Sequence, residues 1–143
     1  MNRRSGSCLC GAVSVEGAVS TDVQACQCRQ CQRWTGGGPL FAVRVKDLEV
    51  RGEDNIAAYH HSDHGERAFC RTCGTTLYWR LQGRAVAFIA PGLFDDQSDM
   101  TLTEEIFVDS RPAWLPPFKG VAQHTGAEME AQLAAFLKKE NTP

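Results

Sequence analysis

Apolar and polar residues alternate over short stretches through most of this chain, as they do in half-buried β-strands. In 41–45, Val43 and Val45 fall on one face and Arg44 on the other. The stretch 85–89 is continuously apolar, as in a strand buried on both faces. Glycine, aspartate and serine separate these stretches, and we expect strands at 12–16, 41–45, 48–50, 75–79, 85–89 and 105–108. The pattern predicts a mainly β protein.

The C-terminal stretch has the period of a helix, which no segment before residue 125 shows. Its apolar residues recur at i, i+4, i+7 and i+8 and form one stripe: Met129, Leu133, Phe136 and Leu137. Thr125 and Glu128 have the spacing of a capping box at its start. We predict one helix over about 126–139, packed by its stripe on the domain or against a second copy in a homodimer.

The length and charge of the chain exclude several classes of protein. Its 143 residues contain no repeat or linker, and we expect a single domain over 1–143. A net charge of −2 without a basic cluster argues against nucleic acid as a partner. No stretch approaches the ~20 apolar residues of a membrane-spanning helix, so we expect no membrane partner. No signal peptide follows Arg3 and Arg4, and we expect a cytoplasmic protein.

The chemistry of the chain lies in its seven cysteines. They form three groups: Cys8 and Cys10; Cys26, Cys28 and Cys31; and Cys70 and Cys73. In a reducing compartment clustered cysteines are more often metal ligands than disulfide partners, and an odd number cannot pair fully within one chain. Gly11 and Gly74 follow two of the groups, where a residue without Cβ lets backbone amides turn toward the sulfurs. The sequence therefore predicts at least one zinc ion.

Spacing alone leaves the assignment of ligands open. The first and third groups together supply four thiolates, which suits a closed structural site. The middle group supplies three, and three protein ligands plus an open position are the composition of a catalytic zinc site. A single four-cysteine site with three free thiols also fits, as does one metal held by both Cys-x-Cys pairs. With two zinc ions per chain, we expect lower occupancy of the second, because three ligands hold zinc less firmly than four.

The motifs resemble those of the glutathione-dependent formaldehyde-activating (GFA) family, which includes the centromere protein V relatives. The family patterns are Cys-x-Cys-Gly-x-Val, Cys-His-Cys-x-x-Cys-Arg, Phe-Cys-x-x-Cys-Gly-x-x-Leu, Gly-x-x-Asp-Asp and Lys/Arg-Pro-x-Trp. The corresponding segments are 8–13, 26–32, 69–77, 92–96 and 111–114, and the resemblance covers about 7–115. Gln27 and Gln32 stand where the family has histidine and arginine, and glutamine cannot carry a proton at neutral pH.

The resemblance implies a β-tent fold of packed antiparallel sheets that bind zinc. It also implies the ligands of two zinc ions: Cys8, Cys10, Cys70 and Cys73 for a structural ion, and Cys26, Cys28 and Cys31 for a second ion with an open position. The activity of the family is the formation or cleavage of S-hydroxymethylglutathione from formaldehyde and glutathione.

We therefore expect a zinc-dependent carbon–sulfur lyase of the GFA type, acting on a glutathione or other thiol adduct of a small aldehyde. Cys26, Cys28 and Cys31 would be its catalytic group. Three arginines flank the cysteines, Arg29, Arg33 and Arg71, and we expect them to offset the negative charge of the zinc thiolates. An arginine beside the open zinc could also hold a glutathione carboxylate. The alternative is a non-catalytic interaction or metal-buffering domain, in which a residue such as His64 closes the second site. Otherwise His64 belongs with His60 and His61 in an exposed polar loop.

Overall fold

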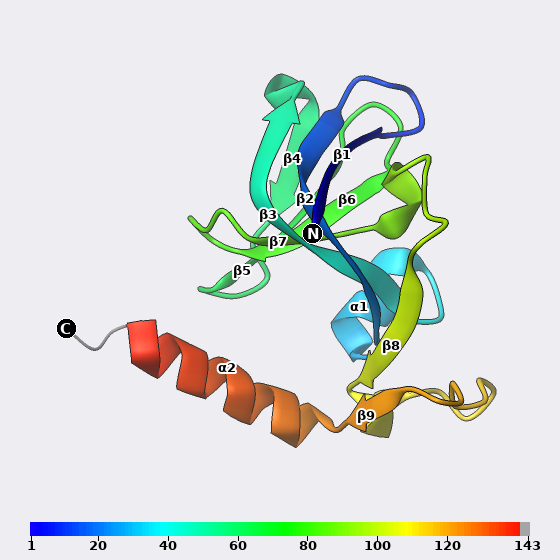
Figure 1. Ribbon diagram of the computed structural model, residues 1–143. Helices are drawn as coiled ribbons and strands as arrows, with labels where there is room; N and C mark the ends of the chain where they lie inside the picture. The colour runs from blue at the N-terminus through cyan, green and yellow to red at the C-terminus, as the bar shows by residue number, and fades with distance from the viewer. Residues whose placement is uncertain (141–143) are drawn as a thin grey trace. The chain divides into compact units, whose positions relative to one another are not determined.

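The computed structural model describes residues 1–140 of the protein and contains a mixed sheet of nine strands (Figure 1). The chain divides into two compact units, Met1–Val23 with Phe41–Thr101 and Gln24–Leu40 with Leu102–Pro143. Two long strands, β2 (Ser14–Cys26) and β3 (Leu40–Arg51), have residues in both units. The prediction of a mainly β protein is confirmed. None of the helices within the described residues has the length and apolar content that a bilayer crossing requires.

The strands of the first unit pair antiparallel to one another. β1 (Asn2–Ser7) pairs with β2, and β3 pairs with β7 (Ala87–Ile89). The sheet continues from β7 through β6 (Thr76–Leu81) and β5 (Gly65–Cys70) to β4 (Ile56–Tyr59). Two short 3₁₀ helices, η1 (Glu53–Asn55) and η2 (Pro91–Leu93), lie in the connections. Because β5 ends at Cys70, the sheet places the third cysteine group at the end of a strand.

β2 runs through Gly17, where the apolar pattern predicted that a strand would end. A Cβ atom on Gly17 would lie 2.5 Å from Cγ1 of Val45 and 2.9 Å from the carbonyl oxygen of Lys46. Glycine is therefore required here by the close approach of β3 and does not mark a turn. Val15 and Val19 on either side are buried in the core of the first unit.

β3 is one strand, although the sequence predicted a turn at 46–47 between two shorter ones. Asp47 has a φ of +54°, which is a left-handed conformation that a non-glycine residue adopts at some cost. The irregularity interrupts the alternation of side chains without ending the strand. Val43 and Val45, predicted to share one face, are both fully buried.

The second unit contains both α-helices, the short α1 (Arg29–Thr35) and the C-terminal α2 (Gly126–Glu140). Between them along the chain lie β8 (Thr101–Ile106), the 3₁₀ helix η3 (Val108–Ser110) and β9 (Ala122–His124). β8 and β9 run parallel, which differs from the fully antiparallel arrangement expected. The sequence predicted a single helix at the C-terminus, and α1 was missed. With seven residues, α1 is too short to show an apolar period.

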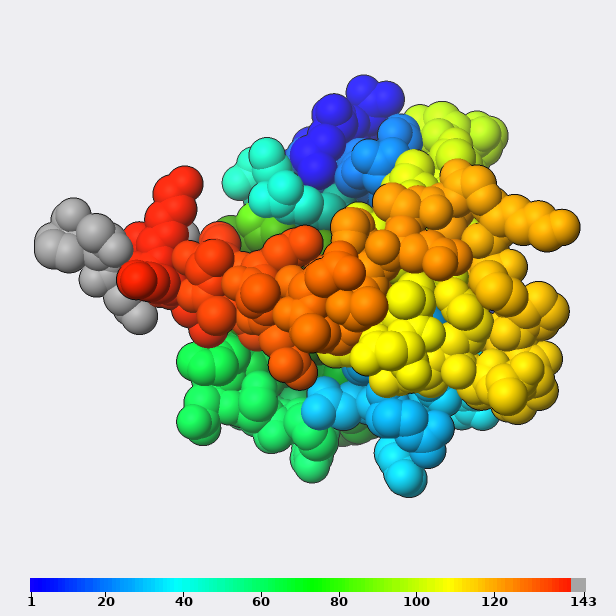
Figure 2. All heavy atoms as spheres, turned by 90° about the horizontal axis from the view of Figure 1, so that it is seen from below, coloured from blue at the N-terminus to red at the C-terminus, as the bar shows by residue number. Residues whose placement is uncertain are grey.

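α2 begins as its capping box predicts, and the Thr125 hydroxyl oxygen accepts the backbone N–H of Glu128 at 3.2 Å. Met129 in its first turns packs against the core of the second unit. Leu133 and Phe136 are 36% and 42% exposed, so the second unit covers only part of the apolar stripe. Figure 2 shows the side chains of α2, in orange to red, at the surface.

Candidate metal centres

In the first unit, Cys8 and Cys10 lie in a tight turn that follows β1. The Cys8 N–H donates to the Val13 carbonyl at 3.0 Å, and the Gly11 N–H donates to the Cys8 carbonyl at 3.1 Å. Gly11 has a φ of +80°, a conformation that glycine adopts without strain. The turn directs the Val13 N–H toward Cys8 Sγ at 3.3 Å, which is the kind of amide–sulfur contact that Gly11 was expected to allow.

Cys70 and Cys73 form a second turn of the same kind. Gly74, with a φ of +77°, donates its N–H to the Cys70 carbonyl at 2.8 Å. The Cys73 N–H lies 3.5 Å from Cys70 Sγ, and Asn55 Nδ2 donates to that sulfur at 3.2 Å. Donors around a sulfur stabilise its thiolate form and orient it as a ligand.

The two turns bring four thiols together, with all four sulfurs within 4.8 Å of one another. Sγ of Cys10 lies 3.7 Å from that of Cys8 and 3.8 Å from that of Cys70. A disulfide would need about 2.05 Å. Four thiolates at about 2.3 Å from a tetrahedral ion lie about 3.8 Å apart, so the donor set and its spacing fit one four-coordinate metal.

The thiols of this group influence one another's acidity. A hydrogen bond with the Thr75 hydroxyl, 3.0 Å from Cys73 Sγ, is the main reason that the pKa of Cys73 falls to about 5. At Cys10 the Ala12 N–H favours the thiolate, but desolvation and the sulfurs of Cys73 and Cys8 outweigh it and raise the pKa to about 11. Adjacent thiolates oppose one another's ionisation, and a bound metal ion removes that opposition.

In the second unit, three thiols come from one short segment between β2 and α1. Cys26 is the last residue of β2, and Cys28 is the N-cap of α1. The sulfur of Cys28 accepts the backbone N–H of Cys31 at 3.3 Å, so a candidate ligand also caps the start of the helix. The sulfurs of Cys26, Cys28 and Cys31 lie within 4.8 Å of one another. Within the part of the second unit that the structure describes, this group includes no histidine or carboxylate, and His64 belongs to the first unit.

The three-cysteine group is built into the core of the second unit. Cys26 and Cys31 are buried and pack with Leu40 and Ile106, while Cys28 is partly exposed. Hydrogen bonding to the sulfurs of Cys28 and Cys31, together with burial, raises the pKa of the Cys26 thiol far above its ordinary value. A metal ion bound by all three sulfurs would reverse this, because a coordinated thiol is deprotonated.

The two glutamines beside these cysteines face into the protein. Gln27 is fully buried, and its Nε2 donates to Oε2 of Glu105 at 2.9 Å. Gln32 Nε2 donates to the carbonyls of Gln27 at 2.7 Å and Ser110 at 2.9 Å. Arg29 Nη1 in turn donates to Oε1 of Gln32 at 3.0 Å. The glutamines therefore tie the cysteine segment to β8 and η3.

Glu105 and Arg111 are two residues of this site to which the sequence analysis assigned no role. Arg111 Nε and Nη2 donate to Oε2 and Oε1 of Glu105, both at 2.9 Å, although Glu105 is fully buried. The hydrogen bonds from Arg111 are the main reason that the pKa of Glu105 lies below its usual value, with Gln27 adding to the effect against desolvation. The sequence feature that could have indicated a buried carboxylate is the glutamate at the start of the predicted strand 105–108.

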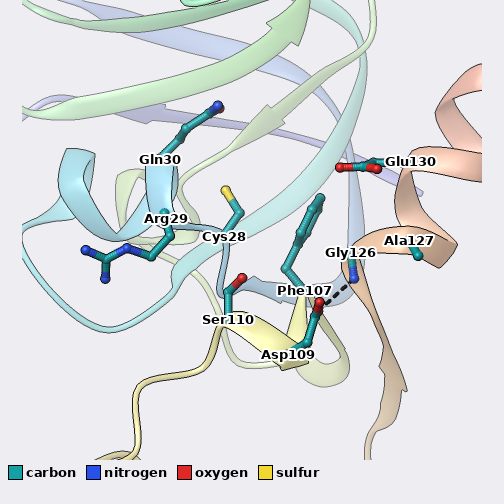
Figure 3. A pocket seen from close by; sticks show the side chains of 9 residues that line it. All are labelled: Cys28, Arg29, Gln30, Phe107, Asp109, Ser110, Gly126, Ala127 and Glu130. Carbon is teal, nitrogen blue, oxygen red and sulfur yellow. Dashed lines mark hydrogen bonds between the residues drawn. The ribbon is translucent and has the colours of Figure 1, made fainter.

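A cavity of about 490 Å³ adjoins Cys28 (Figure 3). Its lining comes from α1, η3 and the start of α2: Cys28, Arg29, Gln30, Phe107, Asp109, Ser110, Gly126, Ala127 and Glu130. The Glu130 carboxylate points from α2 toward the ring of Phe107, and Asp109 Oδ1 accepts the Gly126 N–H at 2.8 Å. A cavity beside the Cys28 thiol provides room for a small molecule next to the three-cysteine group.

The predicted histidine loop lies in the first unit. His60, His61 and His64 are exposed, as expected, and His60 Nε2 lies 3.1 Å from the carboxylate of Glu66. Arg71, one of the arginines near the third cysteine group, donates to the carbonyl of Ile56 at 3.1 Å.

The chain is similar to one family profile and to two curated proteins. The sequence profile described as "Glutathione-dependent formaldehyde-activating enzyme" matches residues 3–110. An uncharacterized lyase of Schizosaccharomyces pombe is 28% identical over 109 residues, covering 75% of this chain and 80% of the relative. A Podospora anserina protein named "Putative glutathione-dependent formaldehyde-activating enzyme" is 35% identical over 83 residues, covering 52% of this chain and only 38% of that protein.

A solved structure shares the fold. The crystal structure of a Rhodobacter sphaeroides protein matches with a TM-score of 0.57 and 22% identity, over 85% of this chain and 99% of the other. At this identity the likeness supports the architecture alone.

Proposed function

The chain belongs to the glutathione-dependent formaldehyde-activating family, and from this membership we propose that it is a zinc-dependent carbon–sulfur lyase. Its substrate would be the adduct of a small aldehyde with glutathione or a similar thiol. The observation that carries the proposal is the cavity beside Cys28, one of three clustered thiols that have no fourth ligand within the described residues.

The four-cysteine group would hold a structural zinc. Cys8, Cys10, Cys70 and Cys73 provide four sulfurs at the spacing that tetrahedral zinc requires, and such a site is closed to substrate. It joins two turns about 60 residues apart in the sequence. Metal binding of this kind contributes folding free energy on the order of 10 kcal/mol.

The three-cysteine group would hold the catalytic zinc. When bound there by Cys26, Cys28 and Cys31, zinc supplies a Lewis acid that stabilises a substrate sulfur as a thiolate. Because Cys28 is the partly exposed member and lines the cavity, we place the substrate sulfur on its side of the group.

The charges around the cavity suit a zwitterionic thiol. Glutathione carries one ammonium and two carboxylates at neutral pH. Arg29 would bind a carboxylate, because a guanidinium can form two parallel hydrogen bonds to it. Glu130 and Asp109 would bind the ammonium, and the ring of Phe107 would exclude water from one side of the reacting carbon.

In the cleavage direction the C–S bond of the hydroxymethyl thioether breaks and its electron pair stays on sulfur. The hydroxyl oxygen forms the second bond of the aldehyde carbonyl and loses its proton to water. The products are a thiolate, an aldehyde and a proton, and no oxidant or reductant is needed. The chain's own residues would orient the adduct so that its sulfur faces Cys28.

The test is to assay purified protein with two bound zinc ions for a change in the rate of S-hydroxymethylglutathione formation or breakdown. Acceleration by the protein, lost in Cys28→Ser with the fold intact, would support the proposal. Two bound zinc ions without any acceleration would exclude the named reaction and favour a binding or metal-buffering role.

The seven cysteines, none of them in a disulfide, agree with a cytoplasmic location.

A further inference from the structure

Gln27 lies between two cysteines of the three-cysteine group, and nearly all of its hydrogen-bonding groups are used. Its backbone N–H donates to the Ile106 carbonyl at 2.9 Å, and its carbonyl accepts Gln32 Nε2 at 2.7 Å. Its side-chain Nε2 donates to Oε2 of Glu105 at 2.9 Å. Each peptide unit is planar. The hydrogen bond to the Gln27 N–H therefore fixes the peptide plane between Cys26 and Gln27, and the bond to its C=O fixes the plane between Gln27 and Cys28.

The Gln27 side chain does not line the cavity beside Cys28. It is fully buried, and it contacts a carboxylate of β8. A residue in this place cannot exchange a proton with a substrate in the cavity without a relay. The role of position 27 is therefore to hold the segment and does not depend on the proton chemistry of a histidine.

The orientation of the Gln27 amide is set by Glu105. A carboxylate only accepts hydrogen bonds, so Nε2 and not Oε1 must face it. Among the described residues, Gln27 Oε1 is a buried side-chain atom without a hydrogen-bond partner. Leaving an acceptor unpaired is unfavourable, and the N–H bond to Glu105 is kept in spite of that cost.

Glu105 is itself held rigidly. Both of its oxygens accept from Arg111 at 2.9 Å, and Oε1 also lies 3.4 Å from Gln123 Nε2. A planar guanidinium bound through two parallel bonds fixes the direction of the carboxylate. Glu105 Oε2 also accepts the bond from Gln27 Nε2, and the Phe118 backbone N–H adds a further hydrogen bond to the carboxylate.

We propose that Glu105, oriented by Arg111, is a positioning residue that acts through Gln27 to fix the directions of the Cys26 and Cys28 sulfurs. Removing a residue whose hydrogen bonds orient a metal ligand typically weakens metal affinity 10–100-fold. The inference rests on the second metal site of the proposed function and not on the lyase reaction.

The experiment measures zinc release from the full-length protein to a chromophoric chelator. Gln27→Met keeps the volume of the side chain and removes the N–H donor. Gln27→His keeps a ring N–H that can reach Glu105. Gln24→Met is the matched control, because Gln24 in β2 donates its Nε2 to Oε1 of Glu104 in β8 at 3.2 Å, the neighbour of Glu105.

We expect Gln27→Met to weaken the more labile zinc 10–100-fold and to leave the tighter zinc unchanged. Gln27→His and Gln24→Met should lose less than tenfold. With cobalt in place of zinc, the thiolate-to-cobalt absorption of the second equivalent should change in Gln27→Met and stay the same in Gln24→Met.

The proposal is overturned if Gln27→Met weakens the labile zinc no more than Gln24→Met does, or if both zinc ions weaken together. If Gln27→Met does not fold, a folded Gln27→His decides the matter, because a tenfold or larger loss there also overturns the proposal. Wild-type protein with a single zinc would overturn it as well. Two zinc ions without lyase activity would exclude only the proposed reaction.

Discussion

The ring of Phe107 occupies the space that a side chain at position 126 would need. A Cβ atom on Gly126 would lie 3.0 Å from Cδ1 and 3.2 Å from Cε1 of Phe107. Phe107 has a φ of +56°, which is costly for an aromatic residue and requires support from its surroundings. The start of α2 therefore packs against the Phe107 ring and keeps it at the edge of the cavity beside Cys28.

Gly126→Ala should lower the catalytic efficiency more than it lowers stability. The new methyl group pushes the Phe107 ring, and a small misplacement beside a reacting group can reduce the rate by about 100-fold. We expect kcat/KM for the aldehyde–thiol adduct to fall at least tenfold, while the melting temperature changes by only a few degrees. Gly92→Ala is the control, because a Cβ there meets nothing within 4 Å. Equal effects of the two variants would show that Phe107 has no special place in the reaction.

The two cysteine groups should differ in what their loss does to folding. Cys73→Ser would remove a ligand of the proposed four-cysteine metal site, and a structural metal contributes on the order of 10 kcal/mol, comparable to the whole stability of a domain. We expect this variant to unfold or to melt far below the wild type in circular dichroism. Cys28→Ser should keep the fold, lose the labile zinc and lose activity. Equal collapse of both variants would mean that both metals are structural.

Glu105→Gln should change the acid stability of the protein. The folded-state pKa of Glu105 is lowered, chiefly by Arg111, so its ionised form stabilises the fold above the unfolded pKa of about 4.3. This contribution is lost as the pH falls through the lower folded pKa. Breaking a buried ion pair costs about 3–5 kcal/mol, so wild type and variant should differ by about 3 kcal/mol above pH ~5 and converge in stronger acid.

Denaturant unfolding at several pH values measures this difference. Protonation of the four cysteines of the first unit affects both proteins alike, so it cancels when the free energies of unfolding are subtracted. Glu104→Gln, on the same strand, should show a difference below about 1 kcal/mol at every pH, because Glu104 is half-buried and bonds to a neutral partner. A constant gap between wild type and Glu105→Gln down to the lowest pH would contradict the prediction.

Glu130→Gln should weaken the recognition of thiols that carry an ammonium group. The carboxylate of Glu130 points into the cavity, and removing its charge should raise KM for a glutathione adduct several-fold with little change in kcat. An adduct of a thiol without an amino group should be unaffected. Glu128→Gln on the same helix, whose carboxylate bonds to His124 at 3.0 Å outside the cavity, is the matched control. The same rise in KM for both substrates would exclude a specific ammonium contact.

The local parts of the site could be predicted from the sequence, whereas its long-range partners could not. Gly11 and Gly74 indicated the two turns, because a positive φ after a cysteine is a local requirement. The bond from Gln27 to Glu105 joins residues 78 positions apart, and no local pattern reports such a pairing. α1 was missed because a seven-residue helix started by a cysteine sulfur has no apolar period.

The strands missed in the first unit have a related cause. β5 carries Glu66 and Arg67, which are only 8% and 6% exposed, so buried polar residues hide its strand character. Gly17 hid the second half of β2, because glycine in a strand resembles a strand end when the neighbouring backbone is unknown. In both cases tertiary contacts reverse what the local residue types indicate.

The three-cysteine group lies within residues 26–31, while the four-cysteine group needs Cys70 as well as Cys8. During synthesis a ribosome completes the first group roughly 2–8 s before it delivers Cys70, at 5–20 residues per second. A nascent chain can therefore capture its first metal in the segment that later becomes the exchangeable site. Glu105 is made later still, so the tightening that it provides would come last. The chain would then acquire its metals in the same order in which it gives them up, with the three-cysteine group first in both.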